Sequence, residues 1–160
     1  MAAKIKGAGG KAKAVKADVS QTAESKRLID AAVDEFGRAA AMGEQGGAII
    51  NIGSVASLSS PPGGAVYSSS KAALDSITKT LAAELGPRKI RVNAVLPGPV
   101  ETEGAQSLPD WDQFKSMLLP RTPLGRTGQP HDVATVVTFL ASEDAGWITG
   151  EIISVAGGLR

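Results

Sequence analysis

The sequence predicts an α/β fold with a mostly parallel sheet, because short strand patterns alternate with helical patterns along its 160 residues. The strand candidates are almost wholly apolar, as in Ala48–Gly53 (AIINIG), which is typical of parallel strands covered on both faces. The helical patterns between them end at Gly or Gly-Pro. The length suits one domain, and we expect residues 1–160 to form it.

The first part of the chain predicts one strand and one helix. Lys13–Val19 is a short strand candidate, and Ser20 is a suitable helix N-cap after it. Apolar residues then recur at helical spacing before Gly37: Leu28, Ile29, Ala32, Val33 and Phe36. Residues 38–47 read as a linker.

Three further strands are expected, at Ala48–Gly53, Ile90–Leu96 and Glu151–Val155. A loop rich in Ser, Pro and Gly at 54–64 precedes a helix from about Val66 to Leu85. A second helix begins at Pro130, with an acidic residue in its first turn. Residues 101–127 read as irregular, apart from a short amphipathic helix indicated by Trp111, Phe114, Met117, Leu118 and Leu119.

Composition and charge exclude several classes of function. A formal net charge of +1 argues against nucleic acid as the main partner. With no cysteine and a single histidine, we expect no disulfide framework and no metal site. No apolar run reaches membrane-spanning length and no apolar targeting segment follows Met1, so we expect a cytoplasmic protein without a membrane partner.

One stretch carries a candidate for acid–base chemistry. Tyr67 is the only tyrosine, and Lys71 follows it by one helical turn, on the same helix face. A free phenol has a pKa of about 10, and a neighbouring ammonium lowers it towards the range of general acid–base catalysis. Ser54, thirteen residues earlier, could hydrogen-bond the oxygen of a carbonyl or alcohol. Ser57, Ser59 and Ser60 offer equivalent hydroxyls, and the spacing to Tyr67 favours Ser54.

Five segments, in this order, resemble the classical short-chain dehydrogenase/reductase family, above all its 3-oxoacyl-acyl-carrier-protein reductase and glucose dehydrogenase branches. They read INIGS, YSSSKAAL, KIRVNAVLPGPVET, PLGRTGQP and TGEIISVAGG. The resemblance implies a Rossmann-like, doubly wound parallel sheet with flanking helices. It also implies an NAD(P)-dependent oxidoreductase that interconverts a small-molecule carbonyl and a secondary alcohol.

The resemblance assigns roles to the residues that match. Tyr67 would be the acid–base residue, Lys71 would lower its pKa and hold the nicotinamide ribose, and Ser54 would orient the substrate oxygen. Residues 101–127 would form the substrate loop. The remaining assignments are cofactor contacts from Asp18 (near the adenine), Pro97, Gly98, Val100 and Thr102, and pocket walls from Trp111, Phe114 and Met117.

Two departures from the family pattern make this an incomplete Rossmann-like domain. The family's glycine-rich turn, which holds the pyrophosphate at a helix N-terminus, has no match, since Gly7, Gly9 and Gly10 precede a strand. This weighs against binding of NAD or NADP. The choice between the two stays open, because the acidic or basic residue that selects between them follows a strand that has no match in this sequence. Between Arg38 and Ala39 the family has a further strand and a helix with an active-site asparagine. Without these neighbours, strand 13–19 is expected to re-pair beside 48–53 or to be loosely held.

The same departures support an alternative function. The chain would then be a catalytically inactive remnant of the family that acts as an interaction or oligomerisation module. Helix 66–85 and the C-terminal strand would supply the contacts of a homo-oligomer, by resemblance to the family.

Overall fold

The computed structural model describes residue 42 and residues 44–160, so the expected strand 13–19, the helix after it and Asp18 lie outside the described residues. Gly47–Arg160 forms one compact unit. It contains the three expected strands: β1 (Gly47–Ile52), β2 (Ile90–Pro97) and β3 (Ile152–Val155). Each strand begins or ends within one residue of its predicted bounds.

The three strands form a parallel sheet in the order β1-β2-β3. Ile50 lies opposite Asn93 in the register of β1 and β2, and Val95 lies opposite Ile153 in that of β2 and β3. Parallel strands place their carboxyl ends at one edge of the sheet, so Gly53, Gly98 and Ala156 follow the strands at the same edge. The predicted α/β class, with a partial doubly wound sheet, is confirmed.

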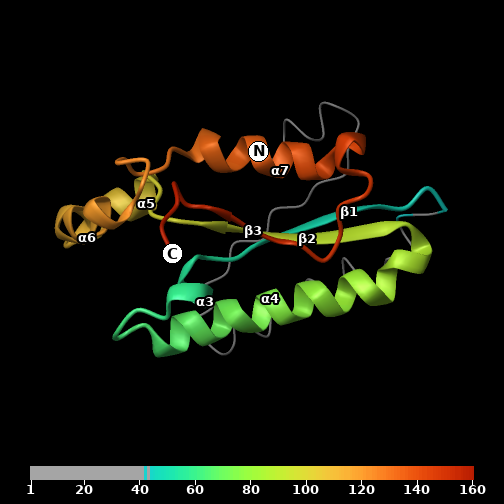
Figure 1. Ribbon diagram of the computed structural model, residues 1–160, viewed down its shortest axis with the longest axis horizontal. Helices are drawn as coiled ribbons and strands as arrows, with labels where there is room; N and C mark the ends of the chain where they lie inside the picture. The colour runs from blue at the N-terminus through green and yellow to red at the C-terminus, as the bar shows by residue number, and fades with distance from the viewer. Residues whose placement is uncertain (1–41, 43) are drawn as a thin grey trace. The chain divides into compact units, whose positions relative to one another are not determined.

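Two long helices cover the sheet from opposite sides (Figure 1). α4 (Ala65–Leu85) lies on one face and α7 (Pro130–Ala141) on the other. The core beneath α7 is apolar and consists of Val95, Val133, Val137, Leu140 and Ala145. β2 is the most deeply buried strand, with Val92 to Leu96 all inaccessible, as expected for a strand covered on both faces.

Two polar side chains of β2 form hydrogen bonds with the backbone at the end of α7 and in the turn before β3. Arg91 donates from Nη1 to the carbonyl of Leu140 (2.8 Å) and from Nη2 to that of Ser142 (3.0 Å), which satisfies acceptors at the C-terminus of α7. Buried Asn93 donates to Ile148 O (2.9 Å) and accepts from the backbone N–H of Glu151 (3.0 Å). These bonds fix the turn that leads into β3.

The remaining described elements are short. The loop expected at 54–64 contains one helical turn, α3 (Ala56–Ser59), which ends at Ser60 with a left-handed φ of 44°. The segment 101–127 contains two helices, α5 (Glu103–Gln106) and α6 (Trp111–Leu118), of which α6 is the predicted amphipathic one. Single turns of 3₁₀ helix lie at Gly86–Arg88, Leu119–Arg121 and Glu143–Ala145. None of the described helices combines the length and apolarity needed to span a membrane.

Candidate functional site

Ser54 is positioned by the continuation of β1 alongside β2. The backbone N–H of Gly53 donates to Val95 O (2.8 Å), and that of Val55 donates to Pro97 O (3.2 Å). A side chain at Gly53 would overlap the side chain of Leu96, so only glycine permits this close approach. Ser54 Oγ accepts a hydrogen bond from the N–H of Ala56 (3.2 Å), which leaves its proton available to an acceptor.

The other serines considered from the sequence are less available. Ser59 donates its hydroxyl to Val55 O (3.2 Å). Ser57 Oγ is buried and finds no hydrogen-bond partner in the part of the chain that the structure describes. Ser60, which follows α3, has a left-handed backbone conformation that is strained for a non-glycine residue. The local geometry therefore agrees with the choice of Ser54.

Tyr67 and Lys71 lie in the first turns of α4 and are brought together as their spacing predicts. Lys71 Nζ is 5.7 Å from the centroid of the Tyr67 ring and donates to Ile52 O at the end of β1 (3.2 Å). Partial burial lowers the pKa of Lys71, and the carboxylate of Asp75 one turn later opposes this shift. Tyr67 is 46% exposed and so remains accessible to a ligand. Within the described residues no hydrogen bond joins Ser54 to Tyr67 directly.

The residues after β2 present backbone groups at the carboxyl edge of the sheet. Gly98 donates its N–H to Val155 O (3.1 Å), and a Cβ there would lie 2.8 Å from that of Ala156, so only a backbone surface fits. Val100 forms an isolated bridge with Gly128, through bonds made by Pro99 O and by the N–H of Glu101. Among the described residues, the N–H of Val100 itself has no acceptor, so it is available to a ligand.

The cofactor contacts predicted for Thr102 and Asp18 stay predictions. Thr102 is the N-cap of α5, where its Oγ1 accepts from the N–H of Ala105 (3.1 Å). Asp18, like Gly7, Gly9 and Gly10, lies outside the described residues. The predicted site residues that the structure brings to one edge of the sheet are therefore Ser54, Tyr67, Lys71 and Pro97–Val100.

Glu101, which no sequence pattern singles out, is a carboxylate whose contacts join four segments of the chain. It accepts hydrogen bonds from Gln106 Nε2 (3.2 Å), Trp111 Nε1 (3.2 Å) and Thr127 Oγ1 (2.9 Å) and pairs with Lys115 Nζ (3.4 Å). These donors lower the pKa of Glu101 to about 2, with the hydrogen bonds of Gln106 and Thr127 as the largest causes. No periodicity links positions 101, 106, 111, 115 and 127, so pattern reasoning could not have found the cluster.

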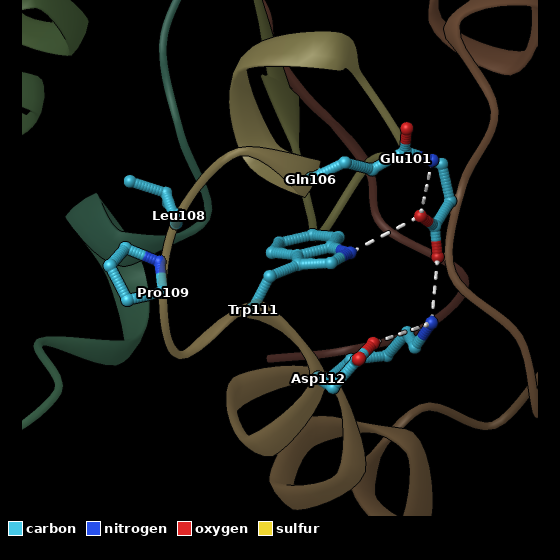
Figure 2. Close-up of a pocket in the computed structure, with 7 residues that line it drawn as sticks. Glu101, Gln106, Leu108, Pro109, Trp111 and Asp112 are labelled. Atoms are coloured by element: carbon cyan, nitrogen blue, oxygen red, sulfur yellow. Dashed lines mark hydrogen bonds and ion pairs between the residues drawn. The ribbon is translucent and has the colours of Figure 1, made fainter.

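Beside this carboxylate lies a cavity of about 400 Å³ (Figure 2). Its lining residues are Glu101, Gln106, Leu108, Pro109, Trp111, Asp112 and Lys115. Trp111, one of the three predicted pocket walls, is buried and borders the cavity with its indole N–H directed at Glu101. Phe114 and Met117 are exposed and do not line it.

Comparison with known proteins identifies the family. A family model described as enoyl-(acyl carrier protein) reductase matches residues 38–160. An uncharacterized oxidoreductase of Methylorubrum extorquens is 43% identical over 198 residues, which include 98% of this chain and 80% of that protein. The chain belongs to the short-chain dehydrogenase/reductase family.

Two further family members show how much of the fold is represented. The 3-oxoacyl-acyl-carrier-protein reductase FabG of Thermotoga maritima is 44% identical over 116 residues, which cover 72% of this chain and 46% of that protein. A solved 4-hydroxyisoleucine dehydrogenase complexed with NADH superposes with a TM-score of 0.71 at 32% identity, over 83% of this chain and 56% of that one. In these two comparisons the chain spans about half the length of its relative.

The Methylorubrum alignment also bears on the internal gap predicted between Arg38 and Ala39. It runs over 198 residues although this chain has 160, so some of that relative's residues have no counterpart here. Relative to the Methylorubrum protein, this chain therefore lacks an internal segment. Its place at Arg38 remains a prediction.

Proposed function

We propose that the chain carries the catalytic part of an NAD(P)-dependent oxidoreductase that interconverts a carbonyl compound and a secondary alcohol. The observation that supports this most directly is the position of Lys71. Its Nζ lies against the end of β1 and beside the Tyr67 ring, at the sheet edge where Ser54 and Pro97–Val100 also lie. In open α/β sheets this edge is where ligands bind. Membership of an oxidoreductase family agrees with this assignment.

In this proposal the chain's own groups manage the substrate oxygen and its proton. Ser54 donates its free proton to the oxygen and fixes its orientation. The Tyr67 hydroxyl gives its proton to that oxygen during reduction and becomes a phenolate, and in the oxidation direction the phenolate takes the proton of the alcohol. The ammonium of Lys71 stabilises negative charge that develops on the phenol oxygen. NAD(P), when bound, would supply or accept the hydride.

Lys71 has a second proposed task, at the cofactor ribose. An ammonium has three donors, and the bond to Ile52 O uses one of them. The others are free to bind ribose hydroxyls, while the N–H of Val100 is free to bind the nicotinamide. The predicted single, incomplete Rossmann-like domain over residues 1–160 is part of the same proposal.

The exposed apolar residues of α4 and its neighbourhood favour a second candidate, a non-catalytic interaction module. This 21-residue helix has three buried residues, Ser68, Thr78 and Ala82. Val66 and Ile77 on α4 and Leu58 on α3 are all exposed. Such a surface could bind a second copy of the chain.

Replacement of the phenol by a plain ring separates the two proposals. Tyr67→Phe keeps the ring beside Lys71 and removes only the hydroxyl, so we expect oxidation of NADH or NADPH with carbonyl substrates to fall by about 100-fold or more. Ser69→Ala, at an exposed position on the same helix, should leave the rate unchanged. Equal turnover in Tyr67→Phe and the unaltered chain would refute the catalytic assignment. No turnover in any form, together with sedimentation as a dimer that Val66→Lys dissociates, would favour the interaction module.

A further inference from the structure

Glu101 is the one described carboxylate that contacts both helices of the substrate segment and the turn before α7. Its donors come from the end of α5 (Gln106), from α6 (Trp111 and Lys115) and from the turn before α7 (Thr127). Its own backbone is fixed, because its N–H donates to Gly128 O (2.9 Å). Figure 2 shows the carboxylate reached by the indole N–H from one side and by the α6 ion pair from another.

Few apolar contacts hold α5 and α6 in place, and besides Trp111 only the partly buried Leu118 of α6 packs against the described apolar core, at the cluster of Val55, Leu96 and Leu159. α5 has no buried residue, and α6 buries only Trp111. The connection between the two helices, Ser107–Asp110, is exposed along its whole length. With so little apolar surface buried, the polar contacts to Glu101 account for a large share of what positions this segment.

We propose that Glu101 is a positioning residue, a carboxylate latch that fastens α5 and α6 to the end of β2 and to the turn at Thr127. The latch follows Pro97–Val100 directly in the chain and lines the cavity beside α5 and α6, so its release would change the shape of that cavity and the approach of a substrate along this segment. That consequence rests on the proposed function, whereas the latch itself does not. The side chain of Glu101 is 15% exposed: its bonds from Trp111 and Thr127 are partly buried, and its bond from Gln106 lies at the surface.

The latch requires an ionised carboxylate. All four partners offer a hydrogen, and a carboxylate can accept them all because it has acceptor sites only. An amide at the same position would present N–H groups to part of this donor set and would lose the attraction to Lys115. Lys115 is also paired with Asp112 (3.5 Å), so it would turn to that partner instead. Glu101→Gln is therefore the variant that tests the latch most directly, since it changes the charge and the number of acceptors while keeping the shape of the side chain.

Trp111 reports directly on the state of the latch. The chain has two tryptophans, and Trp147 is 100% exposed, so Trp147→Phe leaves Trp111 as the only indole. In that background we would measure acrylamide quenching and the emission maximum of Trp111. Glu101→Gln should raise the quenching constant several-fold and shift the emission to longer wavelength, with unchanged helix content by circular dichroism. Glu103→Gln, an exposed charge change two residues away, should change neither value.

Two further readouts distinguish positioning from general destabilisation. Thr127→Val removes one donor at constant shape and should raise quenching less than Glu101→Gln does, which tests the latch even if Glu101→Gln fails to fold. Quenching in the parent chain should rise only in strong acid, while in Glu101→Gln it should be high at every pH where the variant is folded. If turnover is detected, Glu101→Gln should raise KM more than it lowers kcat.

The outcomes separate this inference from the proposed function. The latch would be refuted, whether or not the chain is active, if the quenching constant of Trp111 stayed low in folded Glu101→Gln. A quenching constant in Thr127→Val equal to that of its parent would refute it as well. If Glu101→Gln raises the quenching constant of Trp111 but the unaltered chain turns over no substrate, the result would support the latch and count against the proposed function.

Discussion

Arg91 offers the most direct test of how the described unit holds together. Its guanidinium reaches from β2 to the carbonyl oxygens of Leu140 and Ser142, at 2.8 Å and 3.0 Å. We would replace it by Met, which keeps a long apolar stem and removes the charge and the donors. Because Leu140 O and Ser142 O end the helix, their loss of a partner affects the attachment of α7 to the sheet.

The size of the effect follows from the two bonds. A hydrogen bond from a charged donor contributes about 1.5–3 kcal/mol, and a cation at a helix C-terminus contributes about 0.3–1 kcal/mol. The partial burial of the guanidinium, which lowers the pKa of Arg91, offsets part of this gain. We therefore expect Arg91→Met to reduce the free energy of unfolding by about 2–4 kcal/mol, a large share of the 5–15 kcal/mol typical of a domain.

Urea denaturation followed by circular dichroism measures this change. With a slope of about 2 kcal/mol per molar urea, the midpoint should fall by about 1–2 M. Arg88→Met, at an exposed position beside β2, should shift it little. A midpoint for Arg91→Met equal to that of Arg88→Met would show that the Arg91 bonds do not stabilise the attachment of α7.

Two other predictions concern the edge of the sheet and the latch. Gly98→Ala would place a methyl 2.8 Å from Ala156 Cβ, so overpacking should lower the free energy of unfolding by about 1–3 kcal/mol. Gly104→Ala, where a methyl would meet nothing within 4 Å, should leave the stability unchanged, and equal melting temperatures of the two variants would contradict this prediction. The carboxylate of Glu101 has its pKa lowered from 4.5 to about 2 in the folded chain, so its stabilising effect is complete above pH 4.5 and is lost as the pH falls towards 2. The difference in urea midpoint between the unaltered chain and Glu101→Gln should therefore shrink between pH 4.5 and 2, and a constant difference would count against the ion pair and hydrogen bonds described.

The regular elements could be predicted from the sequence because their signals are local. β1 and β2 are short apolar runs closed by Gly or Pro, and α7 begins at Pro130 and has an apolar stripe. Their adjacency could also be predicted, since parallel strands with helical crossovers leave few alternatives. The single turn α3 has no sequence signal of its own, because Ser, Pro and Gly dominate its surroundings and the hydrogen bond from Val55 to Pro97 O that precedes it depends on the fold.

The candidate site could be predicted only in part. The spacing of Tyr67 and Lys71 fixes their proximity through helix geometry alone. The bond from Lys71 to Ile52 O depends on how α4 packs against β1, which no spacing encodes. The Glu101 cluster depends on two helices and two turns at once, so its donors are adjacent in space and scattered in sequence.

The central claim, that this chain presents the nicotinamide end of a cofactor site around Lys71, is tested most directly by a fluorescence titration with NADH and NADPH. The account predicts saturable binding of at least one of them, weakened about tenfold or more by Lys71→Met, which removes charged hydrogen bonds, and unchanged by Lys79→Met at an exposed position on α4. No saturable signal with either nucleotide, or equal affinity in Lys71→Met, would contradict it.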